Sequence, residues 1–396
     1  MLRSLYSGIS GLRAHQTMLD VTGNNIANVN TTAFKGSATQ FQDTLSQLTQ
    51  GASGPGAQGG TNPAQVGLGV KVAGITTNFA QGSSQATGKA GDMLISGDGF
   101  FITQEGGQAV YTRAGSFDFD ASGRLVTASG AIVQGWAAVD GVINEGGALS
   151  DITIPQNTIV AGKVTKNVTM SGNLPSDTVP GTALLRDVKV YDASGAASTV
   201  SLTFTSTVDG WTVAAKDTAG GTPGSIALTF AKGEQTSVAR TFDLTTAEGD
   251  IVTIDLSILT GQAGISTAAV AKQDGSAPGA LESYSFGKDG TLIGLFSNGE
   301  QKALGRIALA TFTNPGGLEK TGSNGYRTTF NSGTATVGAP GSTGLGALTG
   351  GALEMSNVDL SQEFTNLIVA QRGFQANARI ITTSDEVLQE LTNLKR

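Results

Sequence analysis

Both ends of this 396-residue chain carry the apolar spacing of a helix, and the long stretch between them does not. Near the N-terminus, apolar residues recur at alternating steps of three and four, which is the spacing of a coiled-coil seam. The seam consists of Leu2, Leu5, Ile9, Leu12 and Leu19, with the polar Gln16 between the last two. The C-terminal seam consists of Phe364, Leu367, Gln371, Phe374, Ala378, Ile381, Asp385 and Leu388. The spacing predicts one long helix at each end.

The residues between the two helices alternate between apolar and polar with the period of a β-strand. The clearest runs are Val164–Met170, Val200–Phe204, Ile226–Phe230 and Val252–Ile258. Of the 57 glycines, seven stand in Asp-Gly or Asn-Gly pairs, which are typical of hairpin turns. Because the chain leaves one helix and returns to the other, the two helices can pair antiparallel. The predicted fold class is mainly β with α-helical termini, in nested domains: an antiparallel terminal coiled coil plus two β-rich outer domains.

Four regions are predicted along the chain. Residues 1–30 with 357–396 form the helical domain, residues 71–149 with 282–356 form a β-rich middle domain, and residues 150–281 form a β-rich outer domain. Residues 31–70 form an extended connecting segment that we expect to be partly disordered in the monomer. Its glycine-rich portion, Gln50–Gln65, has too little apolar surface to offset the entropy of ordering it.

The N-terminal helix looks incomplete by itself. Its first 30 residues carry only three charged side chains, Arg3, Arg13 and Asp20. It also contains glycines, each of which costs a helix about 1 kcal/mol relative to alanine, at positions 8, 11 and 23. We therefore expect both terminal helices to become ordered mainly when neighbouring copies cover them. The alternative, in which the helices pack only within one chain, stays open.

Enzyme chemistry is not indicated. The chain has one histidine, His15, and no cysteine, so a multi-histidine or cysteine-ligated metal site is impossible and a histidine triad would need a residue of the helical seam. Asp118, Asp120 and Gly123 resemble the opening of a calcium loop, but the twelfth position is Ser129 rather than glutamate, which favours a hairpin turn. We predict no catalytic, cofactor-binding or metal-binding residues and no cofactor.

Charge and hydropathy exclude two further classes of partner. The net charge is −7 with scattered basic residues, which disfavours nucleic-acid binding. No apolar run exceeds four residues, far short of the roughly 20 that a membrane span needs. The first residues lack the apolar block of a cleavable secretory signal. The absence of cysteine fits a cytoplasmic protein and also an extracellular one that leaves by another route.

Three motifs then resemble one family. The stretch Asn24–Gly36 and the preceding Leu5–Leu12 resemble the start of the flagellar rod and hook axial proteins. Ser356–Leu360 and Leu367–Arg379 resemble the end of the same proteins, and Gly97–Phe101 with Tyr111–Phe117 resembles their interior. The resemblance covers roughly residues 1–145 and 285–396. The residues that carry its leading motif are Asn24, Asn25, Asn28, Asn30, Thr31, Phe34 and Lys35.

The resemblance implies a subunit of the flagellar hook, located outside the cell. Such a subunit polymerises into a hollow, flexible tube that transmits torque from the rod to the filament. The implied partners are further copies of the chain, the distal rod protein, the hook cap protein, the hook–filament junction protein and the flagellar type III export apparatus. The block at residues 150–281 favours a hook subunit over a distal rod protein, which would largely lack it.

The predicted subunit interface lies on the terminal helices. Its residues are Leu5, Ile9, Leu12, Leu19, Ile26, Phe364, Leu367, Gln371, Phe374, Ile381 and Leu388. The asparagines of the leading motif end the first helix and offer amides to neighbours, Phe34 anchors the next segment, and Lys35 pairs with a carboxylate. A surface adhesin and a glycosidase-like β enzyme remain as other interpretations, but neither explains the paired helices.

Overall fold

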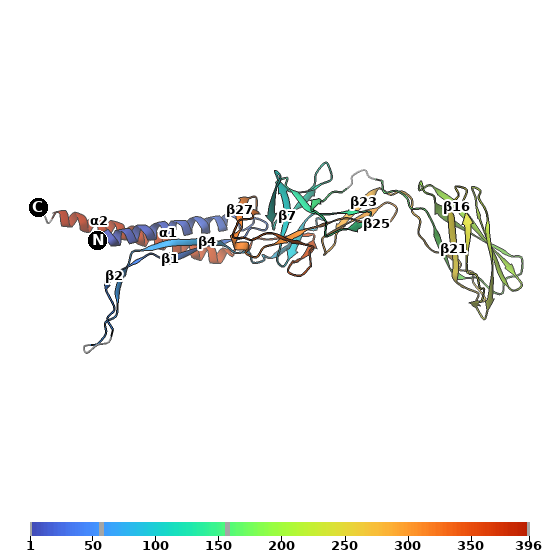
Figure 1. The fold of residues 1–396 in the computed structure, drawn as a ribbon, viewed down its shortest axis with the longest axis horizontal. Coiled ribbons are helices and arrows are strands. Elements are labelled where there is room, and N and C mark those ends of the chain that lie inside the picture. Colours follow the sequence, from blue (N-terminus) through green and yellow to red (C-terminus); the bar gives the residue numbers. More distant parts are fainter. Residues whose placement is uncertain (1, 55–58, 155–158, 394–396) are drawn as a thin grey trace. The chain divides into compact units, whose positions relative to one another are not determined.

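The computed structural model describes residues 2–54, 59–154 and 159–393, and the chain divides into two units (Figure 1). One unit comprises Met1–Ile154, Ser285–Ile293 and Ala303–Arg396, and the other comprises Pro155–Tyr284 and Gly294–Lys302. The predicted fold class is confirmed, because β-strands fill the chain between one helix at each end.

The two helices of the first unit are α1 (Leu2–Ala27) and α2 (Leu360–Asn393), and they run antiparallel (Figure 1). Small residues allow them to approach closely. A methyl group added at Gly11 would lie 2.6 Å from the side-chain oxygen of Asn377, and one added at Gly373 would lie 2.5 Å from the ring of His15. Asp359 caps α2, since its carboxylate accepts the backbone N–H groups of Ser361 and Gln362 at 2.8 and 3.2 Å.

A two-stranded ribbon follows α1. Its strands are β1 (Ser37–Asp43) and β4 (Val70–Thr77), paired antiparallel from Ser37 opposite Thr77 to Asp43 opposite Val70. Beyond it, β2 (Ser46–Gln50) pairs with β3 (Ala64–Gly67). Strands thus occupy much of the region expected as a connecting segment. Residues 55–58, within Gln50–Gln65, lie outside the described part of the chain.

The rest of the first unit is β-structure, which we call the middle β domain. Its main sheet has the strand order β23-β24-β25-β11-β7-β8-β28-β27. Its elements are β5 (Ser84–Ala86), β6 (Met93–Ser96), β7 (Phe100–Glu105), β8 (Gln108–Thr112), β9 (Phe117–Phe119), β10 (Leu125–Thr127), β11 (Ile132–Val139), β12 (Val142–Ile143), β13 (Ser150–Asp151), β24 (Thr291–Phe296), β25 (Gln301–Ile307), β26 (Leu309–Thr311), η1 (Pro315–Gly317), β27 (Glu319–Gly322), β28 (Gly325–Arg327), β29 (Thr336–Gly338), β30 (Ala347–Gly350) and β31 (Ala352–Glu354). The division between the units falls within β23 (Leu281–Phe286), β24 and β25.

Aromatic side chains form one core of the middle β domain. Phe100, Tyr111, Trp136, Phe312 and Tyr326 are all buried there. The rings of Tyr111 and Phe312 meet edge to face with centroids 4.8 Å apart, the arrangement that aromatic quadrupoles favour.

The calcium-like segment is the turn between β9 and β10, as its composition favoured. Asp120 accepts the backbone N–H groups of Ser122 and Arg124, both at 2.8 Å, and its pKa is lowered chiefly by the bond from Arg124. The carboxylate is therefore used to close its own turn.

The second unit is built from two β-sheets. One has the order β20-β21-β14-β22 and the other β15-β16-β17-β18-β19. The strands are β14 (Asn167–Asn173), β15 (Ala183–Tyr191), β16 (Ala197–Thr207), β17 (Gly210–Asp217), β18 (Gly224–Ala231), β19 (Glu234–Gln235), β20 (Thr241–Thr245), β21 (Ile251–Thr260) and β22 (Ala269–Gln273). Alternate residues of both sheets, including Phe204, Trp211 and Ile254, form one buried core.

Most of the alternating runs fall where the sequence placed them. Val200–Phe204 lies in β16, Ile226–Phe230 in β18 and Val252–Ile258 in β21. The run Val164–Met170 is only partly a strand, because β14 begins at Asn167. The residue before it, Lys166, instead donates its backbone N–H to the carboxylate of Asp274 at 2.8 Å.

Candidate assembly interface

Helix α1 has neighbours on two sides, α2 and the ribbon of β1 and β4. Ser10 links it to the ribbon, because its hydroxyl accepts the backbone N–H of Val70 at 3.2 Å. Five predicted interface residues, namely Leu5, Ile9, Leu12, Leu19 and Ile26, are half-buried in this arrangement. Part of the apolar stripe of α1 is therefore covered within one chain.

The predicted interface residues of α2 differ in how deeply they are buried. Leu367, Phe374, Ile381 and Leu388 are half-buried. Phe364 and Gln371 are exposed instead, with 51% of Phe364 accessible.

A second set of apolar side chains on α2 stays exposed after the helices have paired. These residues, which the sequence did not single out, are Leu360, Ile368, Val369, Ile380, Val387 and Leu391. Ile368 alone leaves 57% of its surface accessible. A single seam traced at steps of three and four selects one face of a helix and misses such a set. The sequence does contain a sign of this second set, because α2 has many apolar residues that lie outside that seam.

The asparagines of the leading motif act mainly inside the chain. Asn25 is buried, donates to the carbonyl of Ser37 at 2.7 Å and to Glu363 at 3.1 Å, and accepts the N–H of Ser37 at 3.0 Å. Asn28 donates to the carbonyl of Asn24 at 2.9 Å. These bonds join the end of α1 to β1 and to the start of α2.

The other polar members of the motif are placed differently. The hydroxyl of Thr31 donates to the side chain of Asn28 at 3.0 Å and so belongs to the same internal network. Asn24 and Asn30 are exposed. Among the motif's asparagines, these two are the most accessible to another molecule.

A buried ion pair lies where α1, the ribbon and α2 join the middle β domain. Lys35 Nζ lies 2.5 Å from Glu354 Oε1, and both side chains are almost completely inaccessible. The ammonium also donates to the carbonyl of Ala80 at 2.8 Å, and the N–H of Gly82 donates to the same carboxylate oxygen at 2.8 Å. Burial lowers the pKa of Lys35, and the hydrogen bond to Glu354 opposes that shift.

Further contacts tighten this junction. Arg113 NH1 lies 3.6 Å from the second oxygen of Glu354, and its guanidinium packs over the ring of Phe100 at 5.5 Å. Asn357 accepts the N–H of Gly36 at 2.9 Å and donates to the carbonyl of Asn78 at 2.9 Å. The sequence missed Glu354, although a lysine expected to pair with a carboxylate indicated that such a partner exists.

Phe34 precedes Lys35 in the chain and is buried as well. Lys320 Nζ lies 5.3 Å from the centre of its ring. Lys320 also donates to the hydroxyl of Ser37 at 3.0 Å, and burial lowers its pKa. Polar side chains thus hold together three segments of the chain, near residues 33–37, 78–82 and 354–357.

Within the described ranges, no cluster of three histidine, cysteine or acidic side chains could hold a metal ion. No helix in the part of the chain that the structure covers is long and apolar enough to cross a membrane. The arrangement offers an apolar helix surface and a rigid polar junction, which suit association.

Three family models match the chain, in the order of the regions just described. Residues 5–35 match the flagella basal body rod protein, residues 94–173 the flagellar hook protein FlgE/F/G D1 domain, and residues 349–394 the flagellar basal body rod FlgEFG protein C-terminal region. Over 448 aligned residues covering both chains completely, the sequence is 42% identical to the flagellar hook protein FlgE of Borreliella burgdorferi. The chain belongs to the flagellar hook protein family.

Other members show the breadth of this family. The hook protein FlgE of Treponema pallidum is 36% identical over 463 residues, again with complete coverage of both chains. The flagellar basal-body rod protein FlgG of Bacillus subtilis is 35% identical over 398 residues, also with complete coverage. Hook and rod proteins are thus similar to this chain along its whole length, and the block at residues 150–281 does not by itself distinguish the two.

Family membership fixes the general role. The chain is a structural subunit of the hook of the bacterial flagellum, outside the cell, and its family is a structural family rather than an enzyme family. The hook and rod family also implies that copies of the chain polymerise within the flagellar basal body.

Proposed function

We propose that this hook subunit polymerises through its terminal helices into a hollow, flexible tube that transmits torque from the rod to the filament. The observation that supports the proposal is the set of apolar side chains left exposed on paired helices, above all Phe364, Ile368 and Val369. Burying one such side chain is worth roughly 1.5–3 kcal/mol, so a few of them can hold neighbouring copies together.

The predicted interface residues divide into two roles under this proposal. The half-buried ones, such as Leu12 and Phe374, hold α1 against its intramolecular neighbours and complete the surface that a second copy contacts. The exposed ones, Phe364 and Gln371, contact the second copy directly. Contacts between different surfaces of successive copies generate an open helical polymer rather than a closed ring.

The regions predicted from the sequence have separate tasks in this assembly. The helical domain, residues 1–30 with 357–396, supplies cohesion. The outer domain, residues 150–281, makes small, polar, hydrated contacts that can slide when the tube bends. Tubes of a chain lacking residues 150–281 should be straighter or stiffer in electron micrographs, and unchanged curvature would contradict this assignment.

The proposed partners follow from family membership. They are the distal rod protein at one end of the tube, the hook cap protein during growth, the hook–filament junction protein at the other end, and the flagellar type III export apparatus. The chain has no catalytic role in this proposal, and its work is mechanical.

The substitution Ile368→Asp tests the proposed interface. It places a charge on an exposed position, so the monomer should keep its circular dichroism spectrum while losing the ability to form tubes in negative-stain micrographs. The control is Val238→Asp in the second unit, where the residue is even more accessible to solvent, 103% against 57% for Ile368, and tubes should form normally. Normal tubes from the Ile368→Asp chain would overturn the proposal.

A further inference from the structure

The hairpin of β2 and β3 carries an apolar face that is open to solvent. The two strands form a sheet of their own, and every one of their residues is exposed. Gln47 pairs with Val66, and at the base of the hairpin Leu68 donates its N–H to the carbonyl of Leu45 at 3.3 Å. Because cross-strand partners share a face, Leu45, Val66 and Leu68 lie together, and we call them the hairpin face. Leu45 leaves 84% of its surface accessible.

The hairpin extends away from the helix that supports the neighbouring ribbon. In the ribbon, Val70 is bonded to Ser10 of α1, and a methyl group added at Gly69 would lie 2.2 Å from the same hydroxyl. Beyond that point the hairpin bends away from both helices (Figure 1). A two-stranded hairpin by itself is at best marginally stable in water, and a helix packed on its apolar face stabilises it. The hairpin face therefore has the properties of a docking surface for a helix.

One acidic side chain stands at the base of the hairpin face. Asp43 comes two residues before Leu45, so strand alternation places both on one side, and both line a hollow of about 590 Å³. Asp43 is exposed and forms no ion pair within the described ranges, although Lys71 lines the same hollow. From the pair of Gln47 and Val66 to Asp43 the ribbon is about 13 Å long. Along this length the side chains are apolar, apolar and acidic.

Helix α2 exposes a line of side chains with the corresponding order. Phe364, Ile368 and Arg372 follow one another at steps of four, which places them along one ridge of the helix, and we call them the α2 ridge. All three are exposed, and Arg372 has no ion-pair partner in the part of the chain that the structure covers. The ridge is about 12 Å long. Its side chains are apolar, apolar and basic.

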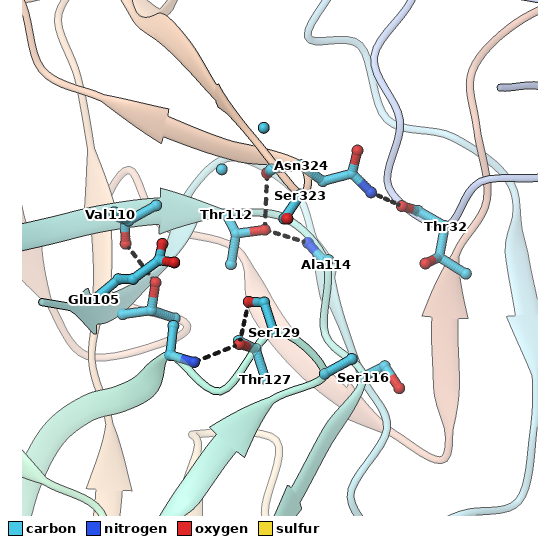
Figure 2. A pocket seen from close by; sticks show the side chains of 15 residues that line it. Thr32, Glu105, Val110, Thr112, Ala114, Ser116, Thr127, Ser129, Ser323 and Asn324 are labelled. Carbon is cyan, nitrogen blue, oxygen red and sulfur yellow. Dashed lines mark hydrogen bonds between the residues drawn. The ribbon is translucent and has the colours of Figure 1, made fainter.

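A hollow in the middle β domain has a different chemistry (Figure 2). Its lining includes the carboxylate of Glu105 and the hydroxyl groups of Ser116 and Ser323. Thr112, which also lines it, donates to the carbonyl of Asn324 at 3.0 Å. An apolar side chain buried there would remove polar groups from water without a hydrogen-bond partner. The α2 ridge therefore suits the hairpin face rather than this hollow.

We propose that the α2 ridge of one copy docks on the hairpin face of another copy, with Arg372 beside Asp43. The proposal rests on the polymerisation proposed above and names the surface that receives the helix. The two surfaces are complementary, because apolar residues extend over similar lengths and opposite charges stand at one end. The family implies polymerisation, which supplies each copy with neighbours. Since the ridge and the face are different surfaces, the contact is heterologous and extends into an open polymer.

Disulfide trapping tests the contact directly, because the chain has no native cysteine. A chain carrying Leu45→Cys and Ile368→Cys is assembled into tubes, oxidised and separated on a denaturing gel without reductant. We expect a ladder of linked chains. The control combines Ile368→Cys with Leu48→Cys, an exposed position on the opposite face of the same hairpin, and should give no ladder. No ladder from Leu45→Cys in well-formed tubes, or a disulfide within one chain only, would overturn the proposal.

Charge reversal tests the end of the contact. Asp43→Arg or Arg372→Asp alone places like charges opposite each other and should raise the critical concentration for tube formation roughly tenfold. The two substitutions in one chain should restore it. The control, Asp209→Arg at an exposed turn of the second unit, should leave it unchanged.

The outcomes separate this contact from the proposed function. Single variants that assemble normally, or a double variant as impaired as the single ones, would refute the pairing of Arg372 with Asp43 while leaving polymerisation through the helices intact. Failure of the unmodified chain to form tubes would instead refute the proposed function, and the contact with it.

Discussion

The helix pair and the second unit bury their apolar residues to very different extents. The second unit encloses Phe204, Trp211 and Val213 almost completely between its two sheets. The helix pair leaves Phe364 and Ile368 more than half exposed. The second unit also exposes apolar residues, among them Leu185 in β15 and Ile251 in β21, but its strands still enclose a buried core of their own. The difference teaches that the β-sandwich is complete in one molecule, whereas the helices provide a surface that requires another.

A substitution in the buried core of the second unit should have the largest effect on stability. Trp211→Ala removes a fully buried indole and should lower the free energy of unfolding of the second unit by about 3–5 kcal/mol. Denaturant titration followed by circular dichroism measures the loss. Val208→Ala, at an exposed position, should change it by less than about 0.5 kcal/mol. If Trp211→Ala were equally harmless, the second unit would not be a self-contained fold.

The buried ion pair should show the next largest effect. Glu354→Ala leaves the ammonium of Lys35 buried without its carboxylate and should destabilise the first unit by about 3 kcal/mol in the same titration. The double variant Lys35→Met, Glu354→Leu removes both charges and should lose less. A double variant as unstable as the single one would show that packing, not charge, holds the junction.

Alkaline pH should weaken the middle β domain through Tyr326. Burial raises its pKa to about 12, above the ordinary value of 10.0. The unfolded chain therefore releases this proton first, and the stabilisation that is complete below pH 10 is lost as the pH rises from about 10 to 12. The loss should be about 1.4 kcal/mol for each pH unit in that window. Unfolding titrations of Tyr326→Phe should show a shallower dependence, and an identical slope would contradict this cause.

Replacing either of two glycines of the helix pair by alanine should change its stability, in opposite directions at the two positions. Gly373→Ala places a methyl group against the ring of His15 and should destabilise the pair by about 1–3 kcal/mol. Gly23→Ala meets nothing within 4 Å and should stabilise α1 by about 1 kcal/mol. Helicity measured during thermal unfolding compares them. Equal responses would mean that the close approach of the helices at Gly373 does not matter.

The local elements of this fold could be read from the sequence because each has its own spacing. The seams of α1 and α2 and the alternation in β16 and β21 depend on neighbouring residues alone. The ribbon of β1 and β4 could not be read, because its strands are mostly exposed and α1 supports them from one side. The partner of Lys35 stands 319 residues away at Glu354, a distance that no local pattern spans.

The candidate interface was only partly predictable for a related reason. Leu12 and Phe374 were identified by spacing, but spacing does not say whether a neighbour in the same chain or in another copy covers them. The ribbon contributes to the cover of α1, so the accessible apolar surface shifts to residues such as Ile368 and Ile380. Which face remains free is a property of the tertiary arrangement.

Hydrogen exchange in dilute monomer and in assembled tubes tests most directly whether the helices are completed by other copies. We expect the amides of α1 and α2 to exchange at least roughly tenfold more slowly in tubes, because assembly buries their exposed faces, while the amides of β16 and β17 exchange equally in both states. Helix amides that are already as protected in the monomer as in well-formed tubes would contradict the account.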